Sequence, residues 1–197
     1  MDRNALCIFS KRPRPGQVKM RLAKHLGNVR AWRLYERWLV ELIEIHHGRA
    51  YELYLAYAPS HERRYFEALV GERCFPQQGS DLGTRMRNAF NQLLGRFDRV
   101  ALIGCDIPGI TDTTIERAFH RLDDHDVVLG PTFDGGYYLI ALKEPINLFS
   151  GVSWGSSRVL NTTLRKAAEQ SLVHARLETK RDIDTIQDLE AFYESSS

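Results

Sequence analysis

The sequence has few cysteines, no long apolar run and no recognisable leader. Its three cysteines are widely spaced, which argues against a disulfide framework or a cysteine-based metal site. No apolar run could span a bilayer, and the N-terminus lacks the pattern of a signal peptide. We therefore expect a cytoplasmic protein without a membrane span. A chain of 197 residues, 43% hydrophobic and 26% charged, suits a single globular domain over residues 1–197.

Acidic residues are missing from the N-terminal region. Nine basic residues and no acidic one lie between Arg3 and Arg33, although the net charge of the whole chain is only +2. Such a stretch can be a solvated surface, a nucleic-acid patch or a loop that binds the phosphates of a small ligand. No nucleic-acid motif accompanies it, so we expect no nucleic-acid partner. It is not a Walker A loop, because it is cationic and lacks Gly-Lys-Ser/Thr.

Short apolar runs alternate with amphipathic stretches along the whole chain. The runs predict strands over residues 5–9, 51–58, 72–76, 100–103, 126–131 and 172–177, and a further strand into which the loop at residues 132–140 runs. Apolar stripes predict helices over residues 29–46, 61–70, 86–94, 113–122 and 161–168, with a further helix at the C-terminus. This alternation predicts a mostly parallel sheet with residues 100–103 near its middle. We interpret the pair His46-His47, at a helix end, as solvated residues.

Acidic residues follow two of the predicted strands. Asp106 stands directly after the strand Val100–Ile103, where ligands bind in an open parallel sheet. Taken alone, Asp106 is better explained as a residue that caps the following turn, and the other motifs of the chain shift the balance towards a site. Asp182 and Asp184 lie just before the terminal helix, and alternation puts both on one side. A carboxylate pair near Asp106 would supply the oxygen ligands that Mg²⁺ accepts.

Three glycine-containing loops are the other candidate ligand contacts. Residues 77–86 suit a base or ribose close to the backbone, or form a turn in which Asp81 caps the next helix. In residues 132–140, Asp134 can hydrogen-bond a sugar or hydroxyl, the alternative being a plain hairpin turn. In residues 148–157, Trp154 either closes over an acceptor or docks in the core.

Several of these segments resemble one family in order and content. They are SKRPRPGQVKMRL, QQGSDLGTRM, IGCDIPGIT, GPTFDGGYYLIAL, the LFSGVSWG loop and DIDTIQDL. They resemble the transferase family called domain of unknown function 2064 (DUF2064), within the nucleotide-diphospho-sugar transferase superfamily. The phospholactate and molybdenum-cofactor guanylyltransferases are more distantly similar. The resemblance implies a single-domain α/β fold of the glycosyltransferase-A type, a Rossmann-like three-layer sandwich with a mostly parallel central sheet.

The motifs and the resemblance together predict a set of site residues. Nucleotide and phosphate binding would fall on Lys11, Arg12, Lys19, Arg21, Gln78, Gly83 and Thr84. Acceptor binding would fall on Gly135, Gly136, Tyr137 and Trp154. Asp106 and Asp184 would hold Mg²⁺ or Mn²⁺, with Asp134 and Lys19 as catalytic residues. Met20 and Ile186 depart from the motifs of the more distantly similar guanylyltransferases, where Thr and Pro are usual.

These residues predict a Mg²⁺-dependent transferase that uses a nucleotide or nucleotide-sugar donor and a small-molecule acceptor. Some family members are described as glycosyltransferases, several of them in arsenosugar biosynthesis, which favours glycosyl transfer. The basic first loop and the single acid of Asp106-Ile107-Pro108 favour nucleotidyl transfer with release of pyrophosphate. A third alternative is a non-catalytic nucleotide-binding module. The oligomeric state stays open, with a homodimer as one alternative. We also expect the Asp106 and Asp184 carboxylates to lie roughly 4 to 7 Å apart, around a shared ion.

Overall fold

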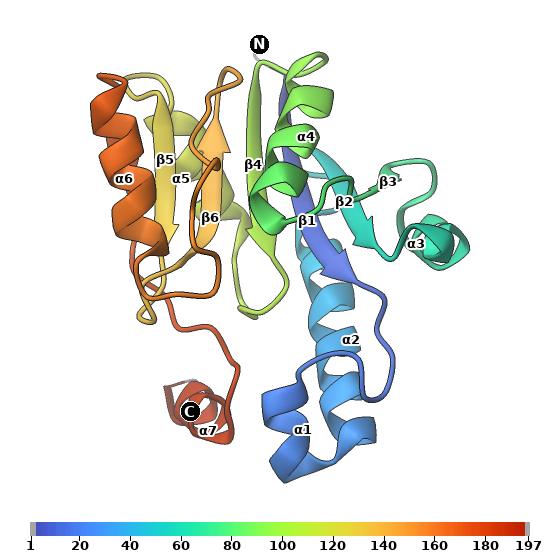
Figure 1. Cartoon of the computed structure of the whole chain (residues 1–197). Coiled ribbons are helices and arrows are strands. Elements are labelled where there is room, and N and C mark those ends of the chain that lie inside the picture. The colour runs from blue at the N-terminus through green and yellow to red at the C-terminus, as the bar shows by residue number, and fades with distance from the viewer. Residues whose placement is uncertain (1–2, 196–197) are drawn as a thin grey trace.

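A computed structural model describes residues 3–195 and places the strands of this region in one twisted sheet (Figure 1). The strand order is β3-β2-β1-β4-β6-β5-β7. All neighbours are parallel except β6, which runs antiparallel to both β4 and β5. The predicted mostly parallel sheet is therefore confirmed, and β4 lies at its centre as expected.

The elements match the sequence pattern closely, with their ends displaced by a few residues. The strands are β1 (Asn4–Lys11), β2 (Glu52–Ala58), β3 (Cys74–Pro76), β4 (Arg99–Gly104), β5 (Val127–Pro131), β6 (Tyr137–Leu142) and β7 (His174–Arg176). The helices are α1 (Met20–Leu26), α2 (Asn28–His46), the 3-10 turn η1 (Ser60–Glu62), α3 (Arg63–Val70), α4 (Leu82–Leu94), α5 (Asp112–Arg121), α6 (Val159–Glu169) and α7 (Ile186–Ser195). The short helix α1, which follows the basic loop, is an addition to the predicted elements.

The sheet is covered on both faces, which explains why its strands read as continuous apolar runs. Alternate residues of β1 show the two faces: Leu6 and Ile8 pack with α2, α3 and α5, whereas Ala5 and Cys7 pack with α4 and α6. The result is the predicted three-layer α/β sandwich (Figure 1). No helix in the described part of the chain is long and apolar enough to cross a membrane.

The interpretation of His46 as a solvated residue is wrong. Its side chain is fully buried, and its Nδ1 lies 2.7 Å from the hydroxyl of Tyr51. Burial lowers the pKa of His46 to about 4, so the ring is neutral at physiological pH. Only the neighbouring His47 is exposed, because α2 ends there and the chain turns outward.

The C-terminal segment packs against the N-terminal helices. A small apolar cluster apart from the main core contains Leu22 of α1, Trp38 of α2, Leu189 of α7 and Ile183, which lies just before α7. Figure 1 shows α7 beside α1, below the carboxyl ends of the parallel strands. This packing brings the predicted acidic residues before α7 to the same edge of the sheet as the end of β4.

Candidate functional site

A cavity of about 680 Å³ opens at the carboxyl ends of β1 and β4. This is the edge where open parallel sheets bind ligands, and the volume suits a small-molecule ligand. The predicted site residues that line it are Lys11, Lys19, Arg21, Asp106, Asp134, Gly136, Tyr137, Trp154 and Asp184. Residues far apart in the sequence therefore converge on one space.

Lys19 lies between the two predicted metal ligands. Its Nζ is 2.7 Å from Asp106 Oδ1 and 3.1 Å from Asp184 Oδ1, and it donates to the carbonyl oxygen of Ile183 at 2.7 Å. The Lys19 side chain is only 3% exposed. Burial by itself would lower the pKa of Lys19, but the nearby carboxylates outweigh it, so the pKa is raised and the ammonium stays charged.

Backbone conformation and backbone hydrogen bonds position Lys19, Asp106 and Asp184 next to one another. Lys19 is the N-cap of α1 and adopts a left-handed conformation with φ of 49°, which is costly for a residue other than glycine and is typical of functional sites. The Ile183 amide donates to the Asp106 carbonyl oxygen at 3.1 Å and ties the two acidic segments together. The Asp184 amide in turn donates to Asp188 Oδ2 at the start of α7.

The expected closeness of Asp106 and Asp184 agrees with this arrangement. The Oδ1 atoms of Asp106 and Asp184 lie 2.7 and 3.1 Å from the same Lys19 nitrogen. Their separation therefore cannot exceed the sum of these two distances, which lies within the expected range. Among residues 3–195 there is no group of three or more His, Cys, Asp or Glu side chains suited to hold a metal ion. A metal at the carboxylate pair therefore stays a prediction, in which other oxygens would complete the ligand set.

The buried hydroxyl of Tyr35 joins the tips of β1 and β4. It accepts a hydrogen bond from the Lys11 amide at 3.0 Å and from the Cys105 thiol at 2.9 Å, and lies 3.3 Å from Ser10 Oγ. Burial is the main reason that the pKa of Tyr35 is raised well above its ordinary value, so the phenol stays neutral. In the sequence, Tyr35 is one of the apolar positions of the helix predicted over residues 29–46, and a helical pattern does not show what its hydroxyl contacts.

Gln77, rather than the predicted Gln78, lines the cavity. The Gln77 amide donates to the carbonyl oxygens of Ala56 and Ser10 at 2.9 and 3.3 Å and so braces the ends of β2 and β1. Gln78 is exposed, and its carbonyl oxygen accepts a hydrogen bond from Asn88. The β3 strand ends at Pro76, so a difference of one position decides which glutamine turns inward.

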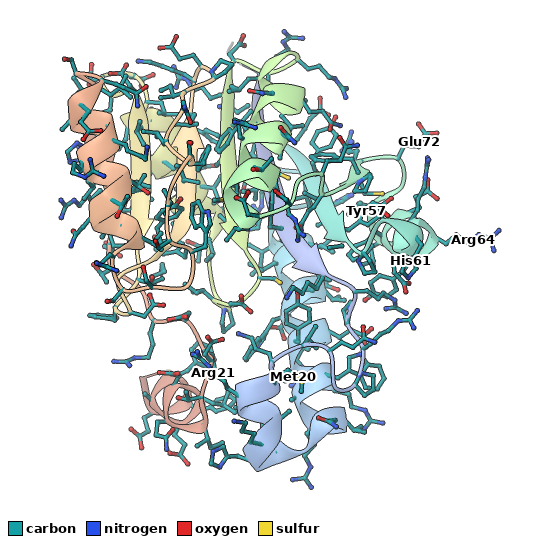
Figure 2. The ribbon with its side chains drawn as sticks, in the orientation of Figure 1. Met20, Arg21, Tyr57, His61, Arg64 and Glu72 are labelled. Atoms are coloured by element: carbon teal, nitrogen blue, oxygen red, sulfur yellow. The ribbon has the colours of Figure 1, made fainter. Side chains whose placement is uncertain are left out.

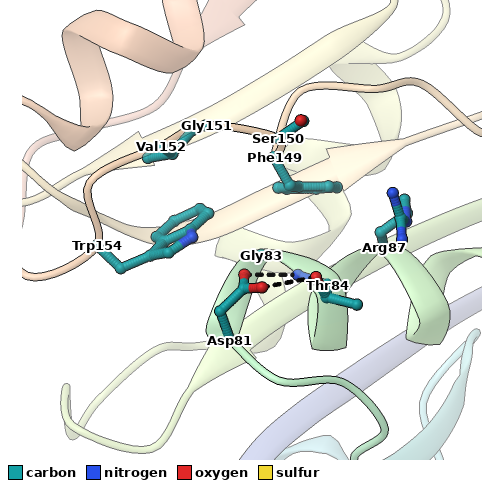
Figure 3. Close-up of a pocket in the computed structure, with 9 residues that line it drawn as sticks. All are labelled: Asp81, Gly83, Thr84, Arg87, Phe149, Ser150, Gly151, Val152 and Trp154. Carbon is teal, nitrogen blue, oxygen red and sulfur yellow. Dashed lines mark hydrogen bonds between the residues drawn. The ribbon is translucent and has the colours of Figure 1, made fainter.

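The predicted residues Gly83 and Thr84 line a second cavity of about 220 Å³ instead of the main one (Figure 3). Asp81 caps α4 there, accepting from the amide and hydroxyl of Thr84 at 3.0 and 2.7 Å. A Cβ on Gly83 would approach the Trp154 indole to 2.8 Å, so the ring packs directly on α4. Trp154 lines both cavities.

The loop between β5 and β6 presents Asp134 to the main cavity. Its Oδ1 accepts from the Thr132 hydroxyl at 2.6 Å and the Gly136 amide at 3.0 Å, whereas no donor within residues 3–195 is hydrogen-bonded to Oδ2. Gly135, a predicted acceptor contact, instead packs on the neighbouring loop, since a Cβ there would lie 2.1 Å from the Ser157 carbonyl oxygen. Half-buried Asp182 has a raised pKa, mainly through burial and secondarily through Asp134.

The basic loop divides its charges between two places. Figure 2 shows Met20 and Arg21 at the start of α1, on the side facing the sheet. Arg12 points elsewhere: its guanidinium lies 3.4 Å from the Tyr65 ring centroid, and its Nε is 3.3 Å from Glu62. The predicted phosphate contact by Arg12 therefore has no support in this arrangement.

A family model described as an uncharacterized protein conserved in bacteria (DUF2064) matches residues 42–156. No curated protein matches the chain. A crystal structure from Desulfovibrio desulfuricans G20, provisionally described as a nucleotide-diphospho-sugar transferase, is 32% identical with a TM-score of 0.94, over 100% of this chain and 89% of that one.

Two other solved structures share the fold at lower identity. A cytidylyltransferase from Leptospira borgpetersenii is 14% identical with a TM-score of 0.63, over 98% of this chain and 85% of that one. Rv0371C from Mycobacterium tuberculosis, in complex with manganese, is 16% identical with a TM-score of 0.52, over 99% of this chain and 100% of that one. The chain thus belongs to the DUF2064 family and has the fold of the nucleotide-diphospho-sugar transferases.

Proposed function

We propose that the chain is a transferase that binds a nucleotide sugar in the main cavity and passes its sugar to a small hydroxylated acceptor. One observation carries the proposal: Lys11, Lys19 and Arg21 line the same cavity as Asp106 and Asp184, at the carboxyl edge of the sheet. Cations at this place suit the oxygens of a diphosphate, and the paired carboxylates of Asp106 and Asp184 would hold a divalent ion that offsets its charge.

The residues present fit Mg²⁺ or Mn²⁺. Asp106 and Asp184 offer hard carboxylate oxygens, and Mg²⁺ commonly takes one or two carboxylates and completes its octahedron with waters and phosphate oxygens. A neighbour of the same fold was crystallised in complex with manganese, which supports a divalent ion as ligand of this fold. When bound, the ion would offset the negative charge that develops on the departing diphosphate.

The chain's own residues would contribute to catalysis mainly by positioning the substrates and by electrostatic stabilisation. Lys11 and Arg21 would bind the phosphates, and the hydrogen bond from the Lys11 amide to Tyr35 holds that end of β1 in place. Asp134 would accept a proton from, or orient, the acceptor hydroxyl through its Oδ2. Its Oδ1 is held by Thr132 and Gly136, so the carboxylate has a fixed direction.

Nucleotidyl transfer is the second candidate function. Asp106 is the single acid at the end of β4, and the cytidylyltransferase fold neighbour points the same way. In that reaction a sugar phosphate or similar group would attack a nucleoside triphosphate, and pyrophosphate would leave.

Phosphorus NMR distinguishes these functions. The protein is incubated with Mg²⁺ and either nucleotide sugars plus simple polyols or nucleoside triphosphates plus sugar phosphates. We expect nucleoside diphosphate in the first set, with no product from Asp106→Asn. Pyrophosphate in the second set would establish nucleotidyl transfer instead. If calorimetry detects no nucleotide binding and neither product forms, the proposed function is wrong.

A further inference from the structure

The space between Asp106 and Asp184 holds a positive charge that the chain itself supplies. Three acceptors surround the Lys19 ammonium, namely the two carboxylates and the Ile183 carbonyl oxygen, and they match its three N–H donors. Lysines are seldom this deeply buried unless they are paired. Without Lys19, two neighbouring carboxylates would repel each other.

A divalent ion and this ammonium compete for the same oxygens. Mg²⁺ binds carboxylate oxygens at about 2.0 to 2.1 Å, closer than either Lys19 contact. An ion shared by the two Oδ1 atoms would therefore displace the ammonium, both by occupying its position and by repulsion between like charges. The exposed guanidinium of Arg21, 3.7 Å from Asp184 Oδ2, has room to remain.

We propose that Lys19 is a tethered cation that occupies the divalent-ion position in the nucleotide-free protein and is drawn away by nucleotide phosphates, so that metal and nucleotide bind cooperatively. This rests on the proposed function. Lys19 lines the same cavity as Lys11 and Arg21, and its flexible four-carbon stem allows the ammonium to move onto phosphate oxygens there. Metal alone then binds weakly, and by linkage each ligand strengthens the other.

Mn²⁺ alone is the first probe, titrated into nucleotide-free protein and followed by electron paramagnetic resonance of the free ion. Lys19→Met removes the competing charge and keeps a chain of similar length. We expect it to bind Mn²⁺ at least about tenfold more tightly than the unsubstituted protein, because one buried cation no longer opposes the ion. Arg21→Met is the matched control. The Arg21 side chain is 75% exposed, so removing its charge near Asp184 should change Mn²⁺ affinity far less than Lys19→Met does.

Thermal unfolding provides the second measurement. Lys19→Met should be less stable than the unsubstituted protein without metal, since its carboxylates repel, and Mn²⁺ should raise its Tm more. If Lys19→Met does not fold, Lys19→Gln takes its place, because the glutamine amide can still donate to one of the three oxygens. Equal Mn²⁺ affinity in the unsubstituted protein and the Lys19 variant that folds would overturn the proposal.

A nucleotide arm separates this inference from the proposed function. Adding a nucleoside diphosphate, corrected for its own chelation of Mn²⁺, should tighten Mn²⁺ binding in the unsubstituted protein and much less in the Lys19 variant. If the Lys19 variant binds Mn²⁺ tightly but no nucleotide changes its Mn²⁺ affinity or that of the unsubstituted protein, then phosphates do not displace Lys19 and the proposed function is wrong. The competition between Lys19 and the metal ion would still be supported. If nucleotides bind but Mn²⁺ affinity is independent of Lys19, the tethered cation is wrong and the proposed function survives.

Discussion

Tyr35→Phe removes a single buried hydroxyl that connects the two halves of the candidate site. The hydroxyl accepts hydrogen bonds from the Lys11 amide and the Cys105 thiol, next to Ser10. Phenylalanine keeps the ring in the core, where Tyr35 is 5% exposed, so packing changes little. The substitution removes the hydrogen-bond acceptor of the Lys11 amide and of the Cys105 thiol.

The size of the effect follows from those contacts. A buried donor left without a partner costs about 1 to 3 kcal/mol, and the thiol is a weak donor that adds little. We therefore expect the free energy of unfolding to fall by about 1 to 3 kcal/mol, with Tm lower by about 2 to 4 °C for each kcal/mol in a chain of this size. Nucleotide affinity should fall as well, because the ends of β1 and β4 lose their common anchor.

Urea unfolding and nucleotide calorimetry measure the two effects. Tyr54→Phe is the matched control. Tyr54 is equally buried, but its hydroxyl bonds to Glu52 at the opposite end of the sheet, so this change should leave nucleotide affinity unaltered. A Tyr35→Phe protein as stable as the unsubstituted chain, with the same nucleotide affinity, would refute the reasoning.

Further variants test the cavity and the core. Asp106→Asn should abolish Mn²⁺ binding and transfer while the circular dichroism spectrum is unchanged; retained Mn²⁺ affinity would exclude Asp106 as a ligand. Gly83→Ala should push the Trp154 indole out of place, because the added carbon would lie 2.8 Å from it; tryptophan fluorescence should shift and stability fall by about 1 to 3 kcal/mol. Arg21→Ala should weaken nucleotide binding most at low salt, as expected for an exposed cation; a salt-independent loss would speak against a charge contact. The pKa of His46 is about 4 in the folded chain against 6.5 for the free side chain, so the unfolded state binds more protons between these values. The contribution of His46 to the free energy of unfolding should be fully present above about pH 6.5 and should fall by up to about 3 kcal/mol as the pH approaches 4. In His46→Gln, the free energy of unfolding should depend less on pH over this range.

The sequence by itself determined the layered fold and the edge of the sheet that carries the site. Strands buried on both faces must be apolar along their whole length, so runs such as Val100–Ile103 are recognisable without any tertiary information. Glycine and proline after these runs mark where the strands stop. Asp106 and Asp134 could therefore be placed at strand ends, and Asp184 before a helix, from local pattern alone.

Only the tertiary structure decided which side chains meet. Lys19 contacts Asp184 across 165 positions, because the cluster that includes Leu22 of α1 and Leu189 of α7 holds these two helices together, and no local sequence pattern contains that packing. The choice between Gln77 and Gln78 depends on the residue at which β3 ends. A helical stripe shows that a residue such as Tyr35 is buried, whereas the partners of its hydroxyl depend on how β1 and β4 approach α2 in space.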